Sequence, residues 1–574
     1  MPVQNSDIAD IFNKVADLLD IEGANPFRVR AYRNAARAVS NLPQNVSDMI
    51  ESEKDLTELP GIGKDLAGKI QEIVGTGSLA QLEDLKGKTS PELIKLMKVA
   101  GLGPKRVKAL NRNLGVTNLK ELKKAAQQGK VREIEGFGEK TEQAILEELE
   151  EVEGKQEERI NLREAEQRAH PLVAYLEKTK GVKEITVAGS YRRRKETVGD
   201  LDILVTCKKG SDVMDRFVNY EDVKKVVSKG TTRSTIVLRS GLQVDLRVVP
   251  QMSYGAALHY FTGSKAHNIA VRTLGVKNKL KINEYGVFKG EKRIAGKTEK
   301  EVYDEVDLPY IDPELRENWG EVEAAKKGRL PGLVVLGDVR GDLHVHTKET
   351  DGRDSLEDMA QAAKEHGYDY LAVTEHSKRV TMAGGMDAKR LGKQIKEIDR
   401  LNGRLKDIVL LKGIELDILK DGSLDLPDDI LKELDLTVCA VHYDRNLSKK
   451  QMTERIIRAM DNPYFNIFAH PTGRLINKRR PYEVDLEKIM EAAKERGCFL
   501  EINAQPDRLD LSDRHCKMAK DMGVKLAVST DAHSVSDLDL IRFGLDQARR
   551  GWLEPDDIIN TRSLKDLKKM LKRK

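Results

Sequence analysis

Apolar residues recur at helical spacing through the first part of the chain. Apolar residues spaced three and four apart predict one buried helix face, which is formed by Ile8, Ile11, Phe12, Val15, Leu18 and Leu19. Residues 6–150 read as short amphipathic helices, and residues 151–168 as a charged helical stretch that connects domains. From about residue 182 to 318 the pattern mixes strands with helices. We therefore expect a helical N-terminal part followed by an α+β part.

Strand-like apolar runs alternate with amphipathic helical segments from residue 337 to 574. Seven such runs end near His346, His376, Glu415, His442, His470, Asn503 and His533. Repeated βα units predict a parallel sheet, and we expect it to close as a distorted (β/α)7 barrel. Residues 319–336, which contain Gly328, Pro331 and Gly332, are predicted to form a linker.

Composition narrows the classes of protein that fit this pattern. The 574 residues are 34% charged, but the net charge is only +5, so a nucleic-acid surface would have to arise from local clustering. None of the four cysteines forms a CxxC pair, which argues against a disulfide framework or a zinc ribbon. The chain has neither a signal-peptide pattern at its start nor a run of 18 apolar residues. We expect a cytoplasmic protein with no membrane partner.

A glycine-containing turn recurs three times between helical segments. Its residues are Gly61, Gly63 and Lys64, then Gly101, Gly103 and Lys105, then Gly136, Gly138 and Lys140. The glycines permit a tight hairpin, and free N–H groups at the following helix N-terminus can receive a phosphate. A plain helix-capping turn would explain one copy, but three copies that each include a lysine favour contact with a DNA backbone. The pattern resembles the helix-hairpin-helix motif.

Three aspartates mark a first candidate site. Asp200 and Asp202 lie on one predicted strand and point the same way, while Asp245 lies on another. Grouped carboxylates repel one another unless cations neutralise them, and Mg²⁺ favours carboxylates together with substrate phosphates. An isolated Asp-x-Asp would more often be surface charge at a sheet edge. The preceding Gly189-Ser190 turn suits a triphosphate, which favours a two-metal nucleotidyl-transfer site.

Histidines mark a second candidate site. Eight of the eleven follow residue 340, and six end apolar strands: His344, His346, His376, His442, His470 and His533. The carboxylates Asp351, Glu415 and Asp531 occupy similar positions. Active sites of βα folds gather at the carboxyl ends of strands, and histidine with carboxylate suits Zn²⁺, Mn²⁺ or Fe²⁺. One such histidine would usually be structural, but six predict a metal centre.

Residues 189–202 are similar to the nucleotidyltransferase signature of DNA polymerase family X, which includes DNA polymerase beta. The resemblance implies that Asp200 and Asp202 hold two Mg²⁺ or Mn²⁺ ions and that Asp245 acts on the primer 3′-hydroxyl. It extends through Tyr260–Ser264 and Ile282–Tyr285. The deoxynucleoside triphosphate would contact Gly189, Ser190, Arg193, Tyr260, Phe261, Gly263, Asn268 and Arg272. Lys265 departs from the family, because polymerase beta has an acidic residue there.

The N-terminal residues 26–36 resemble the lyase domain of the same family. Lys69 falls where the family places its Schiff-base lysine, which would make it catalytic at abasic sites. The alternative is a helix lysine that binds a 5′-phosphate in a gap. Arg28 and Asp65 stand where polymerase beta has lysines, and arginine keeps the charge but forms no imine.

The late histidines and carboxylates resemble the polymerase and histidinol phosphatase (PHP) family, whose nine metal positions are all filled here. The resemblance implies a trinuclear Zn²⁺, Mn²⁺ or Fe²⁺ cluster. Its three ligand sets would be His344, His346, Glu415 and Asp531; Glu415, His442 and His470; and Asp351, His376 and His533. Glu375 stands where many members have aspartate. The basic residues Arg474, Lys478, Arg479 and Arg480 either hold a DNA backbone or form a solvated loop.

The resemblance covers about residues 6–317 and 340–545 and predicts six segments. They are residues 1–86, a lyase-like domain with the first hairpin; 87–153, a helix-hairpin-helix domain; 154–250, a palm; 251–318, a thumb-like subdomain; 319–336, the linker; and 337–574, a PHP phosphoesterase domain. The predicted function is a prokaryotic, nucleoid-associated, monomeric repair polymerase that binds gapped or nicked DNA and trims 3′ ends. The alternative is a DNA end-processing phosphoesterase, an abasic-site endonuclease or 3′-phosphatase, whose polymerase domain only binds gaps.

Overall fold

The computed structural model describes residues 3, 5–40, 42, 44, 46–90, 92–97, 99, 102–152 and 159–573. The chain forms two compact units, Met1–Glu158 and Arg159–Lys574. No helix among the described residues is long and apolar enough to cross a membrane.

The first unit is helical throughout its described residues. Its elements are α1 (Asn5–Glu22), α2 (Pro26–Ser40), α3 (Val46–Glu51), η1 (Leu56–Glu58), α4 (Lys64–Thr76), α5 (Ala80–Lys88), α6 (Glu92–Leu96), α7 (Pro104–Leu114), α8 (Leu119–Gln127) and α9 (Glu139–Val152). The predicted apolar face of α1 is buried, and Phe12 packs edge-to-face on Tyr32 at 5.5 Å. A second core lies under α7, α8 and α9, where Val107, Leu122 and Ile145 are buried.

Each glycine-containing turn opens a helix. Gly63 and Gly103 are the extended N-caps of α4 and α7. Gly61 and Gly136 have φ of +81° and +87°, a backbone conformation that glycine adopts without strain. Gly101 and the side chain of Lys140 lie outside the described residues.

The second unit begins with a five-stranded sheet. Its elements are β1 (Ile160–Asn161), α10 (Leu162–Glu177), β2 (Val182–Val187), α11 (Gly189–Arg192), β3 (Thr197–Val198), β4 (Asp200–Cys207), α12 (Val213–Val218), β5 (Val223–Lys229), β6 (Arg233–Leu238) and β7 (Gln243–Val248). The strand order is β2-β4-β7-β6-β5, in which β4 and β7 pair in parallel and their other neighbours are antiparallel. Because β4 and β7 run in parallel, their first residues, which include aspartates, lie at the same end of the sheet.

A smaller α+β layer follows. It contains η2 (Gln251–Ser253), α13 (Tyr254–Thr262), α14 (Lys265–Lys277), the antiparallel strands β8 (Leu280–Asn283), β9 (Gly286–Lys289) and β10 (Lys292–Ala295), α15 (Glu299–Asp304), η3 (Pro313–Leu315) and α16 (Glu321–Lys326). Helix α16 lies within the segment 319–336. Its first residue, Glu321, is buried and lies 2.6 Å from Nδ1 of His267. The segment between the two sheets is therefore packed rather than extended.

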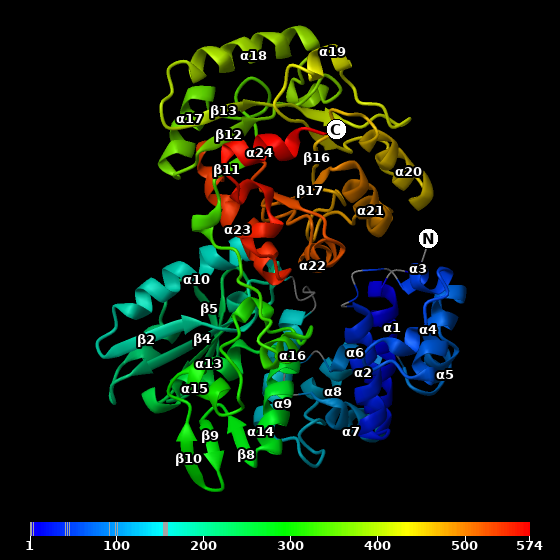
Figure 1. Cartoon of the computed structure of the whole chain (residues 1–574). Helices are drawn as coiled ribbons and strands as arrows, with labels where there is room; N and C mark the ends of the chain where they lie inside the picture. Colours follow the sequence, from blue (N-terminus) through cyan, green and yellow to red (C-terminus); the bar gives the residue numbers. More distant parts are fainter. Residues whose placement is uncertain are drawn as a thin grey trace. The chain divides into compact units, whose positions relative to one another are not determined.

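The remaining residues alternate strand and helix (Figure 1). The elements are η4 (Leu336–Asp338), β11 (Gly341–Val345), α17 (Leu356–Glu365), β12 (Tyr370–Val373), η5 (Thr381–Ala383), α18 (Ala388–Asn402), β13 (Val409–Lys412), β14 (Glu415–Asp417), α19 (Asp428–Leu431), β15 (Val438–Ala440), α20 (Lys449–Met460), β16 (Ile467–Phe468), α21 (Leu486–Arg496), β17 (Phe499–Asn503), α22 (Asp513–Met522), β18 (Leu526–Ser529), η6 (Val535–Leu540), α23 (Ile541–Arg550), η7 (Pro555–Asp557), η8 (Ile559–Thr561) and α24 (Leu564–Leu571).

The strands of this C-terminal segment form two parallel sheets, β11-β12-β13 and β14-β15-β16-β17-β18. Parallel bridges from His376 to Glu415 and from Val345 to Ala532 connect the sheets at both edges. Because the pairing is parallel, the carboxyl ends of the strands all face the same side of the fold.

The sheet of residues 159–250 and the C-terminal segment share one core. Leu509, Leu540 and Phe543 from the C-terminal segment are buried against apolar residues of that sheet. The contact also contains buried ion pairs. Arg194 contacts Glu166 and Asp546 at 2.7 and 2.8 Å.

Arg550 of α23 is the most deeply buried cation of this contact, with 1% of its side chain exposed. It contacts Oδ2 of Asp513 at 2.7 Å and Oε1 of Glu317 at 3.2 Å, and it donates to the carbonyl of Arg193 at 2.6 Å. Burial alone would raise the pKa of Glu317, but the charges of Arg550, Lys195 and Arg193 lower it to about 2. The cation therefore keeps two buried carboxylates ionised.

Arg550→Gln is expected to lower the free energy of unfolding by about 3–5 kcal/mol, because it leaves buried carboxylates without their partner. Calorimetric unfolding of the full chain at neutral pH measures the loss. Arg549→Gln is the matched control, since the neighbouring Arg549 also contacts a carboxylate, Glu314, at 2.8 Å but is 18% exposed. Equal destabilisation by both variants would contradict this account.

The ion pair between Arg550 and Glu317 makes the stability of the fold depend on pH. The folded-state pKa of Glu317, about 2, lies below its ordinary value of 4.5. A lowered pKa stabilises the fold above the ordinary value, and this stabilisation is lost as the pH falls toward the folded value. The wild-type unfolding temperature should therefore fall between about pH 5 and pH 2, and it should fall less steeply in Arg550→Gln.

Candidate metal centres and nucleic-acid contacts

The three predicted aspartates lie on adjacent parallel strands. Asp202 of β4 and Asp245 of β7 are direct partners in the register, and Asp200 lies two residues before Asp202, on the same face. Asp245 is buried, accepts a hydrogen bond from the Thr235 hydroxyl and has Arg233 Nη2 at 3.5 Å. The strand pairing thus brings the aspartates to one end of the sheet.

The aspartates affect one another electrostatically. Burial, followed by the negative charges of Asp200 and Asp245, raises the pKa of Asp202 to about 6. A raised pKa in a carboxylate group reports repulsion that divalent cations would relieve. Gly189 has φ of +62°, and a Cβ there would lie 2.8 Å from Oδ2 of Asp202. A side chain at this turn would therefore collide with the candidate site.

The predicted nucleotide-contacting residues gather around α11, α13 and α14. Arg193 directs Nε to Oε1 of Glu317 at 3.0 Å and donates Nη1 to the carbonyl of Thr262. A Cβ at Gly263 would lie 3.2 Å from Nη1 of Arg193. The predicted residues on or beside these helices are Gly189, Ser190, Tyr260, Phe261, Asn268 and Arg272. The Arg193 guanidinium therefore lies beside the Gly263 turn, where Glu317 pairs with it.

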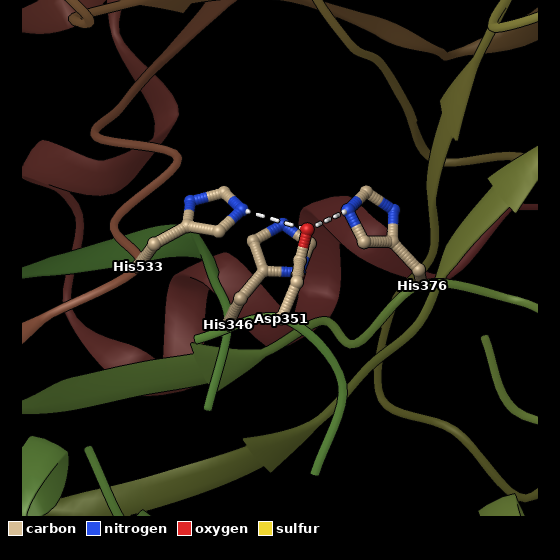
Figure 2. A group of neighbouring side chains, drawn as sticks. All are labelled: His346, Asp351, His376 and His533. Atoms are coloured by element: carbon tan, nitrogen blue, oxygen red, sulfur yellow. Dashed lines mark ion pairs between the residues drawn. The ribbon is translucent and has the colours of Figure 1, made fainter. Parts of the chain in front are cut away.

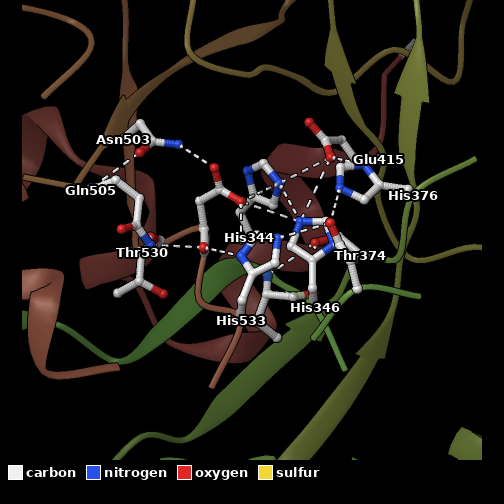
Figure 3. Close-up of polar contacts among 12 residues, drawn as sticks. His344, His346, Thr374, His376, Glu415, Asn503, Gln505, Thr530 and His533 are labelled. Atoms are coloured by element: carbon white, nitrogen blue, oxygen red, sulfur yellow. Dashed lines mark hydrogen bonds and ion pairs between the residues drawn. The ribbon is translucent and has the colours of Figure 1, made fainter. Parts of the chain in front are cut away.

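The nine histidines and carboxylates of the second candidate site lie close together at or beside the ends of the C-terminal strands, and Figure 3 shows His344, His346, His376, Glu415 and His533 among them. Glu415 lies at their centre. Its Oε2 lies 2.7 Å from Nδ1 of His376, and its Oε1 lies 3.3 Å from Nε2 of His442 and 3.2 Å from Nε2 of His470. Oε2 also lies 3.6 Å from Nε2 of both His344 and His346. One carboxylate therefore faces five imidazoles.

Two further carboxylates complete the group. Asp351 Oδ2 lies 3.3 Å from Nε2 of His376 and 3.4 Å from Nε2 of His533, with His346 beside them (Figure 2). Asp531 Oδ1 lies 3.6 and 3.3 Å from Nε2 of His344 and His346. Three sets of ligand atoms are close enough to share one ion each: His346, Asp351, His376 and His533; His344, His346 and Asp531; and His376, Glu415 and His442.

The hydrogen bonding of these atoms tests whether the residues fit metal ions. Nδ1 of His346 is buried without a hydrogen bond among the described residues, and Nδ1 of His376 and Oε2 of Glu415 lie 2.7 Å apart without hydrogen-bond geometry. Buried polar atoms in proteins are nearly always satisfied, and a cation would satisfy these. Burial disfavours charge on His376, yet Glu415 and Asp351 raise its pKa to about 10. This negative potential fits divalent ions.

Three groups that orient the ligands are absent from the sequence predictions. Glu501 Oε1 lies 2.7 Å from Nδ1 of His344, and Asp417 Oδ1 lies 3.3 Å from Nδ1 of His442. Asn503 donates to Oδ2 of Asp531 at 3.1 Å. Such partners fix the ring orientation of metal-binding histidines. The alternation of Glu501 and Asn503 along β17 is the signal that would have indicated two of these groups.

Glu375 lies outside this group. It accepts hydrogen bonds from the hydroxyls of Thr347 and Thr350, and burial raises its pKa to about 7. The basic residues of the loop after His470 differ in their partners and in their exposure. Arg474 is held by Glu196 at 2.7 Å and by the carbonyl of Arg508, so it neither faces solvent nor is available to DNA.

Lys69 lies on α4 in the first unit. Its Nζ contacts Asp65 one turn earlier and lies 5.9 Å from the centre of the Tyr32 ring. The Lys69 side chain is 17% exposed, whereas Asp65 is 80% exposed. The lysine side chain is therefore mostly covered and lies beside an exposed acid.

Family models match five successive parts of the chain. They are a helix-hairpin-helix domain at residues 3–79, a SAM-like helix-hairpin-helix tandem at 93–151, a DNA polymerase beta palm at 159–258, a DNA polymerase beta thumb at 257–317 and a PHP domain at 342–505.

Curated relatives match the whole chain or its later part. The chain is 38% identical over 576 residues to the DNA polymerase/3′-5′ exonuclease PolX of Bacillus subtilis, covering 100% of both proteins. It is 31% identical over 244 residues to a probable phosphatase of Thermoanaerobacter sp. (strain X514), covering 41% of this chain and 94% of that protein. A probable phosphatase of Caldanaerobacter subterraneus is 32% identical over 263 residues, covering 43% of this chain and 95% of that protein.

Proposed function

The chain belongs to the family X DNA polymerases that carry a C-terminal PHP domain, and we propose that it fills short gaps and trims 3′ ends during DNA repair. It is a DNA polymerase with a 3′-5′ exonuclease function. The observation that carries the proposal is that one chain holds two separate groups of side chains that could bind metal ions. Asp202 and Asp245 are paired on the palm, and nine histidines and carboxylates lie close together in the PHP domain.

At the palm, Asp200, Asp202 and Asp245 would hold two Mg²⁺ or Mn²⁺ ions, which stabilise the attacking and leaving oxygens of an in-line displacement. Asp245 is the group nearest the primer 3′-hydroxyl in this proposal. The Gly189 turn leaves room beside Asp202 for a triphosphate, and Arg193 supplies a positive charge to it. The other residues of the nucleotide pocket are Ser190, Tyr260, Phe261, Gly263, Asn268 and Arg272.

In the PHP domain, the nine ligands would hold up to three Zn²⁺, Mn²⁺ or Fe²⁺ ions. Ions at this site would lower the pKa of a water toward about 7 and neutralise charge on a phosphoryl oxygen. The residues of the chain contribute orientation. Glu501 and Asp417 fix the rings of His344 and His442, and Asn503 fixes the carboxylate of Asp531. Phosphodiester hydrolysis at a 3′ end follows from this arrangement.

The alternative of a phosphoesterase whose palm only binds gaps draws support from the phosphatases that match the C-terminal part. The complete aspartate set disfavours it, because a binding module has no use for three grouped carboxylates near a DNA backbone. A phosphate backbone would be repelled by Asp200 and Asp202 unless cations intervened.

We further propose the organisation of the chain. The two parallel PHP sheets would form one distorted (β/α)7 barrel, supported by the bridges at both sheet edges. The six segments would follow the predicted boundaries, with gapped or nicked DNA held by the three hairpins and deoxynucleoside triphosphates by the palm and thumb. The protein would act as a monomer at the nucleoid of a prokaryotic cell.

The lyase-like region supports a narrower prediction. Lys69→Ala is expected to weaken binding of a gapped duplex with a 5′-phosphate by about tenfold, because a charged contact to phosphate is lost. Fluorescence anisotropy at fixed salt measures this, with Lys86→Ala, an exposed lysine paired with Glu83, as the control.

A gap without the 5′-phosphate separates phosphate binding from general DNA binding. Lys69→Ala and wild type should bind that duplex equally, and unequal binding would argue against a phosphate contact. Borohydride trapping on a 5′-deoxyribose phosphate end tests the catalytic alternative for Lys69. A crosslink that disappears in Lys69→Ala would establish imine chemistry.

A gapped-duplex assay tests the proposed function as a whole. With Mg²⁺ or Mn²⁺ and deoxynucleotides, the primer should lengthen by the number of missing nucleotides. Without deoxynucleotides and with Mn²⁺, the primer should shorten from its 3′ end. A protein that neither extends nor shortens the primer would overturn the proposal.

A further inference from the structure

We propose that Arg445, Arg479 and Arg508 form a subsite for a second phosphate of the DNA strand whose 3′ nucleotide is removed at the PHP centre. The proposal rests on the exonuclease function proposed above and assigns it a substrate class. The preferred substrate would be a strand with at least two phosphodiesters, rather than a nucleotide or a lone 3′-phosphate.

The three arginines converge from separate segments next to the metal ligands. Arg445 and Arg479 both donate to the carbonyl of Gly473, Arg479 at 3.1 Å, and Gly473 lies three residues after His470. Arg508 directs Nε to Oδ2 of Asp531 at 3.8 Å. Arg508 therefore lies next to the proposed ligand Asp531, and Arg445 and Arg479 lie at Gly473.

Packing holds this arrangement. The guanidinium of Arg445 lies over the Tyr482 ring, 5.6 Å from its centre. Tyr482 is buried and donates its hydroxyl to the carbonyl of Pro471 at 2.6 Å. Gly473 has φ of +59°, and a Cβ there would lie 2.6 Å from Nη2 of Arg445 and 2.8 Å from the Tyr482 ring. The backbone is thus shaped so that Arg445 can approach it.

Two of the three positive charges have no acid within ion-pair distance in the part of the chain that the structure describes, whereas Arg508 faces Asp531 at 3.8 Å. Among the described residues, no carboxylate lies within ion-pair distance of Arg445 or Arg479, whereas the neighbouring Arg474 has Glu196 at 2.7 Å. Asp510 lies in the same region, but it is buried, accepts from the Thr472 backbone, and its pKa is raised by burial. Two guanidinium groups without counter-ions, those of Arg445 and Arg479, form a site that suits a phosphate.

The pKa values agree with this geometry. Burial and then the charges of Arg445 and Arg508 lower the pKa of Arg479 to about 10. Burial likewise lowers the pKa of Arg445, and Arg508 adds to the effect. Crowded cations gain most from an anion that arrives between them, because it relieves their mutual repulsion.

The placement distinguishes a second phosphate from the one that is cleaved. The scissile phosphate would lie among the ligands of the metal ions, whose charge neutralises it. The arginines instead form a path from solvent toward those ligands. Arg479 is exposed at the outer end, while Arg445 and Arg508 are half-buried. A strand that entered along this path would place its next phosphate against the arginines when its end reached the ions.

Two substrates test the proposal with Mn²⁺-loaded full-length protein. One is a single-stranded oligonucleotide, and the other is the 4-nitrophenyl ester of thymidine 5′-monophosphate, which has one phosphodiester. The double variant Arg445→Gln/Arg479→Gln should raise KM for the oligonucleotide about tenfold or more, because two charged contacts to phosphate are lost. Its kcat/KM for the ester should stay within about twofold of wild type. The slope of log KM against log salt should fall by about 1.

Controls keep a folding defect apart from a lost contact. Arg479→Gln alone changes an exposed side chain and should raise KM for the oligonucleotide in the same direction by a smaller factor. Lys478→Gln removes a neighbouring charge that contacts Asp507 at 3.3 Å and should leave both substrates unchanged.

The outcomes separate this inference from the proposed function. If wild type hydrolyses both substrates and the double variant loses both equally, or neither, the second-phosphate subsite is overturned and the nuclease assignment stands. If wild type hydrolyses neither substrate, the nuclease assignment fails and the subsite fails with it. Selective loss on the oligonucleotide alone supports the subsite.

Discussion

Primer extension is expected to fall by about a thousandfold or more in Asp202→Ala, while exonuclease activity stays at the wild-type level. Asp202 is paired in register with Asp245 and carries a pKa raised to about 6 by burial and by its neighbouring aspartates. Removal of this carboxylate takes away a ligand that both proposed ions share. The loss should appear in kcat rather than in DNA binding, because the substitution does not alter the three glycine-containing hairpins that are proposed to hold DNA.

The rate of single-nucleotide insertion into a gapped duplex measures this effect. Asp215→Ala is the matched control, since Asp215 is an exposed aspartate of the same sheet domain that contacts Lys229. The control should polymerise normally. Extension by Asp202→Ala at a rate within tenfold of wild type would remove Asp202 from the catalytic site.

His344→Ala is expected to have the complementary effect: loss of at least about a hundredfold in 3′-5′ exonuclease rate with polymerisation unchanged. His344 faces Glu415 and Asp531 at 3.6 Å each and is oriented by Glu501 at 2.7 Å. Truncation would therefore remove a ligand from the set that His344 forms with His346 and Asp531. The Mn²⁺ content of the purified protein, measured by atomic emission, should fall in parallel.

His366→Ala serves as the control for the second site. His366 lies at the surface end of α17 and contacts Asp539 at 3.1 Å, away from the nine ligands. Its replacement should change neither activity. Exonuclease activity that survives in His344→Ala, or that falls equally in His366→Ala, would contradict the assignment of the PHP centre.

Much of both sites follows from local sequence pattern. Alternation along β4 predicts that Asp200 and Asp202 share a face, and the structure places Asp245 beside them through one parallel pairing. The apolar runs predict the strand ends near His346, His442 and His470, because parallel strands of a βα fold end on one side. Short-range periodicity and known connection rules were sufficient for these features.

Other features depend on contacts between distant segments, which the sequence pattern does not encode. Arg474 reads as part of a basic loop, but its charge is balanced by Glu196 from the palm. Arg550 resembles a helix-end arginine, yet it is buried between Asp513 and Glu317. The arginine group around Gly473 likewise joins three segments. Tertiary packing, both within the C-terminal segment and between it and the preceding residues, determines these partners.

Two distinct groups of side chains are proposed to bind divalent ions. Diffraction at the manganese absorption edge, from crystals grown with Mn²⁺, gapped DNA and a deoxynucleotide, tests this directly. We expect anomalous peaks beside Asp202 and Asp245 and a separate cluster of peaks around Glu415. Ordered crystals that show Mn²⁺ elsewhere, with no peak at one of these two positions, would contradict this proposal.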